Sequence, residues 1–133
     1  MIGVIDTSAL IRLFVPDGPI PDGLDEFFQG VERGRNIAIA PELIVVESAN
    51  VINKKRKAGE ISEEESRQLL LDILAMPIRL FPHRPLIQPS FDLASEYELT
   101  LYDALFLALA TAQGAIVFST DEAMVKVAGL MNL

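Results

Sequence analysis

The sequence predicts an α/β fold in which helices cover both faces of a parallel sheet. Short apolar runs alternate along the chain with longer segments whose apolar residues recur at helical spacing. Such alternation is typical of βαβ units, whose strands run parallel. The chain has 133 residues, half of them hydrophobic, which suffices for one domain with a buried core. We therefore expect residues 1–133 to form a single domain.

The N-terminal half switches repeatedly between strand and helix patterns. Ile2–Ile5 is short, mostly β-branched and bounded by an acid, so a buried strand is expected there, followed by a helix over 7–14. Three prolines and two glycines in VPDGPIPDG predict a loop, after which a helical pattern resumes over 24–31. A second strand is expected over 37–40. Since proline is tolerated in the first turn of a helix, the next helix should begin at Pro41 and end near Ala58, before Gly59.

The C-terminal half continues the alternation. Ser62 and Glu65 have the spacing of a capping box and should open a helix that Pro77 closes. The tail 129–133 could hold a further short strand, so the expected sheet has four to five strands. The remaining elements are expected as strands over 78–81 and 115–118 and as helices over 86–97, 100–114 and 121–128.

Composition and charge limit the classes of function. Nineteen acidic residues face eleven lysines and arginines, a net charge of −8. Nucleic-acid binding usually shows as a basic surplus, so this charge argues against a polyanion partner unless clustered acids hold divalent cations. No apolar stretch approaches the roughly 18 residues that a membrane span needs, and no signal peptide is evident. There is no cysteine, which excludes disulfides and thiolate metal sites. A cytoplasmic protein with no membrane partner is expected.

Four acidic residues occupy positions where acids are unusual. Asp6 follows the first expected strand and Asp121 follows the fourth, and ligands of such sheets bind beyond the carboxyl ends of the strands. Glu47 lies on an apolar helical face, and Asp103 belongs to a helix that is apolar nearly all round. A carboxylate in such surroundings is costly unless it is paired or binds a metal. All four acids can converge on one end of the sheet.

Each acid also has a purely structural explanation. Asp6 and Asp121 could cap the helices that follow them, and Asp103 lies three residues after Thr100, as in a capping box. Glu47 lies in mid-helix and would instead need a buried salt bridge. These alternatives remain open for each residue, but they do not explain why all four acids can converge.

The available chemistry favours an oxygen-liganded metal. With one histidine and no cysteine, the usual zinc sites are excluded, whereas clustered carboxylates select Mg²⁺ or Mn²⁺. Such ions activate water for attack on a phosphodiester. His83 lies between prolines and is expected to be a loop residue, so a histidine acid–base pair is not available. Ser8 has no histidine base, which argues against serine hydrolysis. No phosphate-binding glycine loop or nucleophile-elbow motif is present.

Four segments resemble, in order, the motifs of PIN-domain ribonucleases, and in size the chain is most similar to the VapC-type toxins of toxin–antitoxin pairs. The segments are VIDTSAL, PELIVVESANVI, LTLYDALFLALA and FSTDEAM, the third being the most specific. The resemblance covers nearly the whole chain. The matching motif acids are Asp6, Glu47, Asp103 and Asp121; Ser119 stands where threonine is commoner, and the C-terminal strand is less clear than in many relatives.

The resemblance implies a three-layer α/β/α sandwich, an endoribonuclease dependent on Mg²⁺ or Mn²⁺, a homodimer, and a cognate antitoxin that occupies the active site. In this hypothesis Asp6 and Asp103 bind the first metal directly, and Asp121 completes or extends the site. Glu47 orients water or binds metal itself. The activated water attacks phosphorus and leaves a 3′-hydroxyl and a 5′-phosphate.

Hydroxyl groups and cations complete the expected site. Ser8 and Ser119 should hydrogen-bond the carboxylates and hold them in place. The Asp6 carboxylate should point at Asp103 and not at its own helix, which Thr7 and Ser8 can cap. The dense basic run at 54–57 either contacts RNA phosphates or simply complements a helix C-terminus. Further candidates for phosphate contacts are Arg12, Arg33 and Arg35, each of which is otherwise simply a solvated side chain. The loop PDGPIPDG either flanks the cleft or is only a connector. The RNA-contact candidates of the basic run are Lys54, Arg56 and Lys57.

Other functions stay open at this point. The chain could be a PIN nuclease in RNA processing or on DNA or structured substrates, or a catalytically silent binding module. The presence of all four acids argues against the silent module. An unrelated phosphotransfer or receiver-like domain would need paired acids after the first strand, and Asp6 is not paired.

Overall fold

A central sheet of four parallel strands organises the protein, whose computed structural model describes residues 1–133. The strands lie in the order β3-β2-β1-β4, so β1 and β2 are central and β3 and β4 are the outermost strands. Since all pairs are parallel, the four strands end on the same side of the sheet, which we call its carboxyl edge. The strands are β1 (Ile2–Ile5), β2 (Ile37–Pro41), β3 (Ile78–Phe81) and β4 (Ile116–Phe118).

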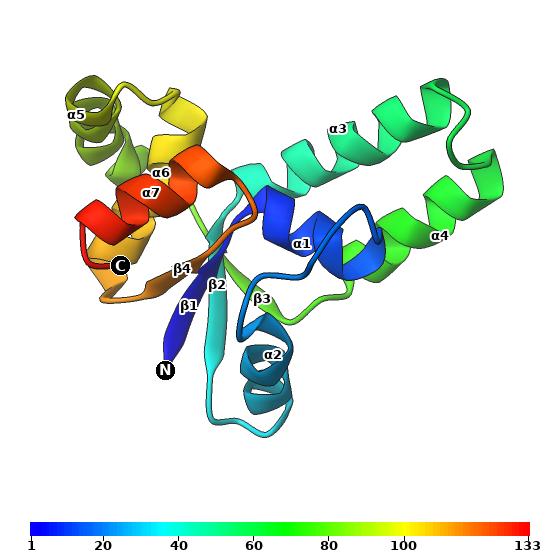
Figure 1. The fold of residues 1–133 in the computed structure, drawn as a ribbon, viewed down its shortest axis with the longest axis horizontal. Helices are drawn as coiled ribbons and strands as arrows, with labels where there is room; N and C mark the ends of the chain where they lie inside the picture. Colours follow the sequence, from blue (N-terminus) through cyan, green and yellow to red (C-terminus); the bar gives the residue numbers. More distant parts are fainter.

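Helices lie on both sides of this sheet, which confirms the predicted α/β fold (Figure 1). Helices α5, α6 and α7 lie on one side, and α1, α2, α3 and α4 on the other. Helices α3 and α4 pack against each other and extend together away from the sheet. The helices are α1 (Thr7–Phe14), α2 (Leu24–Glu32), α3 (Leu43–Lys57), α4 (Glu63–Leu74), α5 (Ile87–Tyr97), α6 (Leu101–Gln113) and α7 (Glu122–Leu130), with a 3₁₀ turn at Arg84–Leu86.

The core forms where the central strands meet the apolar helices. Val4 and Ile5 of β1 are fully buried, as is most of β2. Residues 104–110 of α6 are all buried, as their near-continuous apolar sequence predicts. Gly3 allows α2 to approach β1 closely, because a Cβ at this position would lie 2.7 Å from the ring of Phe27. This packing fixes the strand ends that carry the first and fourth motifs.

One predicted boundary is wrong. Pro41 does not start a helix; it is the last residue of β2 and pairs with Phe81 of β3. Proline cannot donate a backbone hydrogen bond, and at this strand end the next residue does so instead, since the Glu42 amide donates to the Phe81 carbonyl at 2.9 Å. Helix α3 therefore begins at Leu43.

The C-terminal tail does not form a fifth strand. Helix α7 runs to Leu130, past the predicted end, and the last residues fold back onto it. The amide of Met131 donates to the Val127 carbonyl and that of Leu133 to the Ala128 carbonyl, so they do not reach the sheet. The sheet thus has four strands, the lower bound of the prediction. None of the helices combines the length and apolar character that crossing a membrane requires.

Candidate active site

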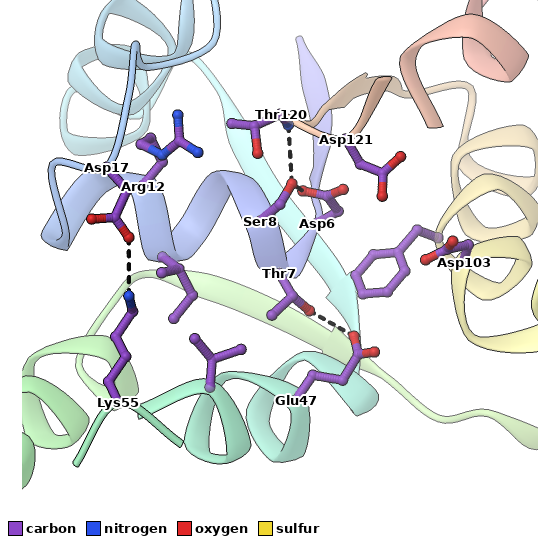
Figure 2. A pocket seen from close by; sticks show the side chains of 13 residues that line it. Asp6, Thr7, Ser8, Arg12, Asp17, Glu47, Lys55, Asp103, Thr120 and Asp121 are labelled. Atoms are coloured by element: carbon purple, nitrogen blue, oxygen red, sulfur yellow. Dashed lines mark hydrogen bonds and ion pairs between the residues drawn. The ribbon is translucent and has the colours of Figure 1, made fainter. Parts of the chain in front are cut away.

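The four motif acids line one pocket at the carboxyl edge of the sheet (Figure 2). The pocket has a volume of about 370 Å³. Its acids come from four separate segments: the β1–α1 junction, α3, the start of α6 and the β4–α7 junction. The convergence proposed from sequence spacing is therefore present in the fold, and the lining acids of the four motifs are Asp6, Glu47, Asp103 and Asp121.

Asp6 is the N-cap of α1 and is almost fully buried, at 4% exposure. Its Oδ1 accepts hydrogen bonds from the Ala9 amide at 2.9 Å and from the Ser8 hydroxyl at 2.7 Å. The prediction that this carboxylate turns away from its own helix, leaving Thr7 and Ser8 to cap it, is wrong. An acid at this position caps well because its oxygen reaches the otherwise unpaired amides of the first turn.

Ser8 joins the first motif to the fourth. Besides donating to Asp6, its Oγ accepts a hydrogen bond from the Thr120 amide at 3.0 Å and lies 3.3 Å from the Ser119 Oγ. Ser119 in turn accepts a hydrogen bond from the Asp121 amide at 3.0 Å. Ser8 therefore contacts a motif carboxylate directly, as predicted. Ser119 accepts from the backbone of Asp121 and also acts on the Asp6 side chain, where its hydroxyl lowers the pKa of that carboxyl. Together they hold the β4–α7 junction next to the β1–α1 junction.

Asp121 also caps a helix. Its Oδ1 accepts a hydrogen bond from the Met124 amide at 3.1 Å, at the start of α7. The structural explanation therefore holds for both residues. Each cap uses Oδ1 of the carboxylate and leaves Oδ2 outside the capping hydrogen bond.

Glu47 is half-buried on α3, and the salt bridge considered as its structural explanation is absent. Instead, the Thr7 hydroxyl donates to Glu47 Oε1 at 2.6 Å (Figure 2). A hydroxyl satisfies one oxygen without neutralising the charge. The start of α3 is held by His83, whose Nε2 accepts a hydrogen bond from the Leu43 amide at 2.8 Å. His83 precedes the 3₁₀ turn, as its loop prediction allows, but its role at α3 has no signal in the local sequence.

Asp103 lies in the first turn of α6, before the fully buried stretch, and is only half-buried. The Thr100 hydroxyl caps this helix by accepting a hydrogen bond from the Asp103 backbone amide at 3.1 Å. The cap therefore depends on the backbone of Asp103, and its carboxylate remains available to the pocket.

Two acids of the pocket bind their protons more tightly than usual, chiefly because they are buried. Burial raises the pKa of Asp6 above its usual range, and the charge of Asp121 adds to this, while the polar groups of Ser119, Ala9 and Ser8 partly oppose it. Burial also raises the pKa of Asp103, again with a contribution from Asp121. The pocket is thus a region of concentrated negative potential, as expected for a site that binds cations.

The donor set suits a hard divalent cation. All candidate ligands are oxygens, which Mg²⁺ and Mn²⁺ prefer. In this structure no three acidic side chains are gathered closely enough to share one ion. One oxygen of each capping acid and one of Glu47 stay outside the hydrogen bonds described above, so the chemistry of these donors suits such an ion although their spacing does not enclose one here.

The basic run of α3 is distributed differently from the prediction. Lys54, Arg56 and Lys57 do not line the pocket, and Arg56 instead pairs with Asn53 and Glu63. Lys55 lines it, together with Arg12 and the loop residue Asp17. The signal that could have identified Lys55 is its spacing of eight residues from Glu47, which places both on one helix face.

Comparison with known proteins shows the family. The model of the PIN domain matches residues 3–130. Ribonuclease VapC1 of Mycobacterium tuberculosis is 32% identical over 96 residues, which is 71% of each chain. Ribonuclease VapC3 of Pyrobaculum aerophilum is 23% identical over 125 residues, 92% of each chain.

Solved structures share the fold at lower identity. PAE2754 of Pyrobaculum aerophilum has a TM-score of 0.70 at 20% identity, over 92% of this chain and 76% of that one. Mycobacterium tuberculosis VapC20, a toxin that cleaves the sarcin–ricin loop, has a TM-score of 0.64 at 13% identity, over 94% of each chain. The VapBC2 structure of Rickettsia felis, bound to a promoter DNA fragment, has a TM-score of 0.61 at 17% identity, over 88% of this chain and 85% of that one. By its sequence match, and in agreement with its fold, the chain belongs to the PIN domain family, with VapC ribonucleases among its relatives.

Proposed function

We propose that residues 1–133 form one PIN domain that acts as a VapC-type ribonuclease, the toxin of a toxin–antitoxin pair, and requires Mg²⁺ or Mn²⁺. The observation that carries this proposal is the convergence of four acids from four segments on one pocket. The sequence similarity to proteins named ribonuclease VapC supports the reaction class.

Each residue of the pocket has a proposed role in the reaction. Asp6, Asp103 and Asp121 would hold the cation, with Glu47 either joining them or orienting water. Bound there, the cation supplies water activation and stabilises charge on the phosphodiester. Ser8 fixes the carboxylate of Asp6 and ties it to the β4–α7 junction. Thr7 fixes that of Glu47. Removing such supporting hydrogen bonds weakens metal sites by misorienting their ligands.

The proposed partners follow from the same relatives. The Rickettsia felis structure contains VapBC2, and another similar structure is a toxin–antitoxin complex from Klebsiella pneumoniae. We propose an antitoxin that covers this pocket, and a homodimer as the assembled toxin in the cytoplasm. RNA is the proposed substrate, and the acidic chain would bind it only after cations have neutralised the pocket.

The test is cleavage of total RNA in Mn²⁺, with the cut sites mapped by sequencing. The control is Asp6→Asn, since asparagine can still cap α1 and so preserves the fold. Wild type should cut RNA at defined sites, and Asp6→Asn should lose at least about 100-fold in rate. Single-stranded DNA is tested in parallel. Full Mn²⁺-dependent cleavage of RNA by Asp6→Asn would refute the assignment, and cleavage of DNA alone would change the substrate.

A further inference from the structure

One cation of the pocket is held by a carboxylate that is not among the motif acids. Lys55 Nζ lies 2.9 Å from Asp17 Oδ2 (Figure 2). It also lies 3.3 Å from Glu60 Oε2. The Lys55 side chain is only 18% exposed, whereas that of Asp17 is 59% exposed. The lysine is therefore fixed beside the pocket, and its main partner is on the solvent side.

The position of Lys55 on α3 relates it to the site. Glu47, Val51 and Lys55 are spaced by four residues and all line the pocket. At 1.5 Å per residue, Lys55 lies about 12 Å along the helix from Glu47. A cation this far along the helix from Glu47 suits a phosphate that flanks the scissile one better than the scissile phosphate itself.

The loop that carries Asp17 is fastened to the same rim. Arg12 Nη1 donates to the Pro19 carbonyl at 3.0 Å, which holds the loop over 15–23 beside α1. Of the residues that line the pocket, five are acids and two are cations, namely Arg12 and Lys55. Both cations thus contact this loop. In the free protein, the side chains that could bind a polyanion are therefore already engaged in contacts within the chain.

We propose that Lys55 binds a flanking phosphate of the substrate RNA and that Asp17 is an internal competitor that occupies this phosphate subsite until RNA displaces it. A carboxylate and a phosphate present similar anionic oxygens to an ammonium group, so one can replace the other. The exposed Asp17 can swing into solvent, whereas Lys55 remains in place. This inference rests on the proposed ribonuclease function.

The experiment measures KM and kcat for a short single-stranded RNA in Mn²⁺, over a range of salt concentrations. Lys55→Gln should raise KM about tenfold and leave kcat near the wild-type value. Asp17→Asn should lower KM about two- to fivefold, the range of an exposed ion pair. In the variant that combines Lys55→Gln with Asp17→Asn, KM should equal that of Lys55→Gln alone, because Asp17 no longer has a lysine to compete for.

A matched control removes the same charge one residue away. Lys54 lies on the same turn of α3 as Lys55 but does not line the pocket, so the Lys54→Gln variant should have a KM near that of wild type. Lys55→Gln should also lower the salt slope of RNA binding by about 0.7 relative to Lys54→Gln, measured by anisotropy in Mn²⁺ with a non-cleavable single-stranded RNA analogue.

Two outcomes separate this inference from the function on which it rests. Equal KM values for Lys55→Gln and Lys54→Gln, or an Asp17→Asn variant that binds no more tightly, overturn the phosphate subsite while cleavage itself stands. A wild-type protein that neither binds nor cleaves RNA overturns both.

Discussion

At the scale of single residues, the site is built from carboxylates with two tasks. Asp6 and Asp121 each give one oxygen to the first turn of a helix. Because a carboxylate has two oxygens, capping does not consume the group. Burial has a cost of its own, because it raises the pKa of Asp6 above the usual value of 3.8, whereas the capping hydrogen bond from Ala9 lowers it.

This cost predicts a pH dependence of stability. In the folded protein Asp6 binds its proton more tightly than in the unfolded chain, so without metal its contribution weakens the fold as pH rises from 3.8 through the raised pKa. Asp6→Asn keeps the cap and removes the charge. In EDTA at neutral pH, the thermal midpoint of this variant should therefore lie above that of wild type; a difference of ~1 kcal/mol corresponds to about 4 °C. Below pH 3.8 the two midpoints should converge, because Asp6 is then protonated in both the folded and the unfolded wild type. A lower midpoint at neutral pH would contradict this reasoning.

The same residues show what the sequence could and could not predict. The location of Asp6 and Asp121 after strands β1 and β4 follows from hydrophobic patterning and was predicted correctly. The direction of the Asp6 carboxylate was not, because capping and ligation require the same residue type at the same position. Only the structure shows which carboxylate oxygen accepts the capping hydrogen bond.

At the scale of elements, α3 carries Glu47 and Lys55 into the pocket, and its start depends on a residue from far along the chain. The Leu43 amide would otherwise lack a partner, since Glu42 makes no side-chain cap. His83 supplies the acceptor through its Nε2. Local sequence could not reveal this contact, and the same long-range pairing of β2 with β3 extends the strand through Pro41.

Removing this acceptor should loosen the start of α3. We expect His83→Ala to lower the free energy of unfolding by about 1 kcal/mol, or roughly 3–6 °C in the midpoint. Arg84→Ala is the control, because Arg84 is the exposed neighbour on the same turn. Thermal denaturation compares the two variants. Equal midpoints would show that the His83 contact does not stabilise α3.

At the scale of the whole molecule, fold and charge act together. Parallel strands bring four acid-bearing segments to one edge, which the alternation of short apolar runs and helices was enough to predict. The relation of Lys55 to Asp17 could not be predicted, since it depends on how a proline-rich loop returns to α3. The chain has a net charge of −8, and five acids but only two cations line this pocket, so a divalent cation would compensate charge where the acids gather.

The most direct measurement is the Mn²⁺ dependence of both stability and RNA cleavage in wild type and Asp103→Asn. This variant is informative because the α6 cap uses the backbone of Asp103 and not its carboxylate. In wild type, saturating Mn²⁺ should raise the melting midpoint and start RNA cleavage. Asp103→Asn should melt in EDTA at or above the wild-type midpoint, yet lose both the Mn²⁺ stabilisation and the cleavage. If Asp103→Asn retains both responses at wild-type strength, the pocket is not the metal-dependent active site.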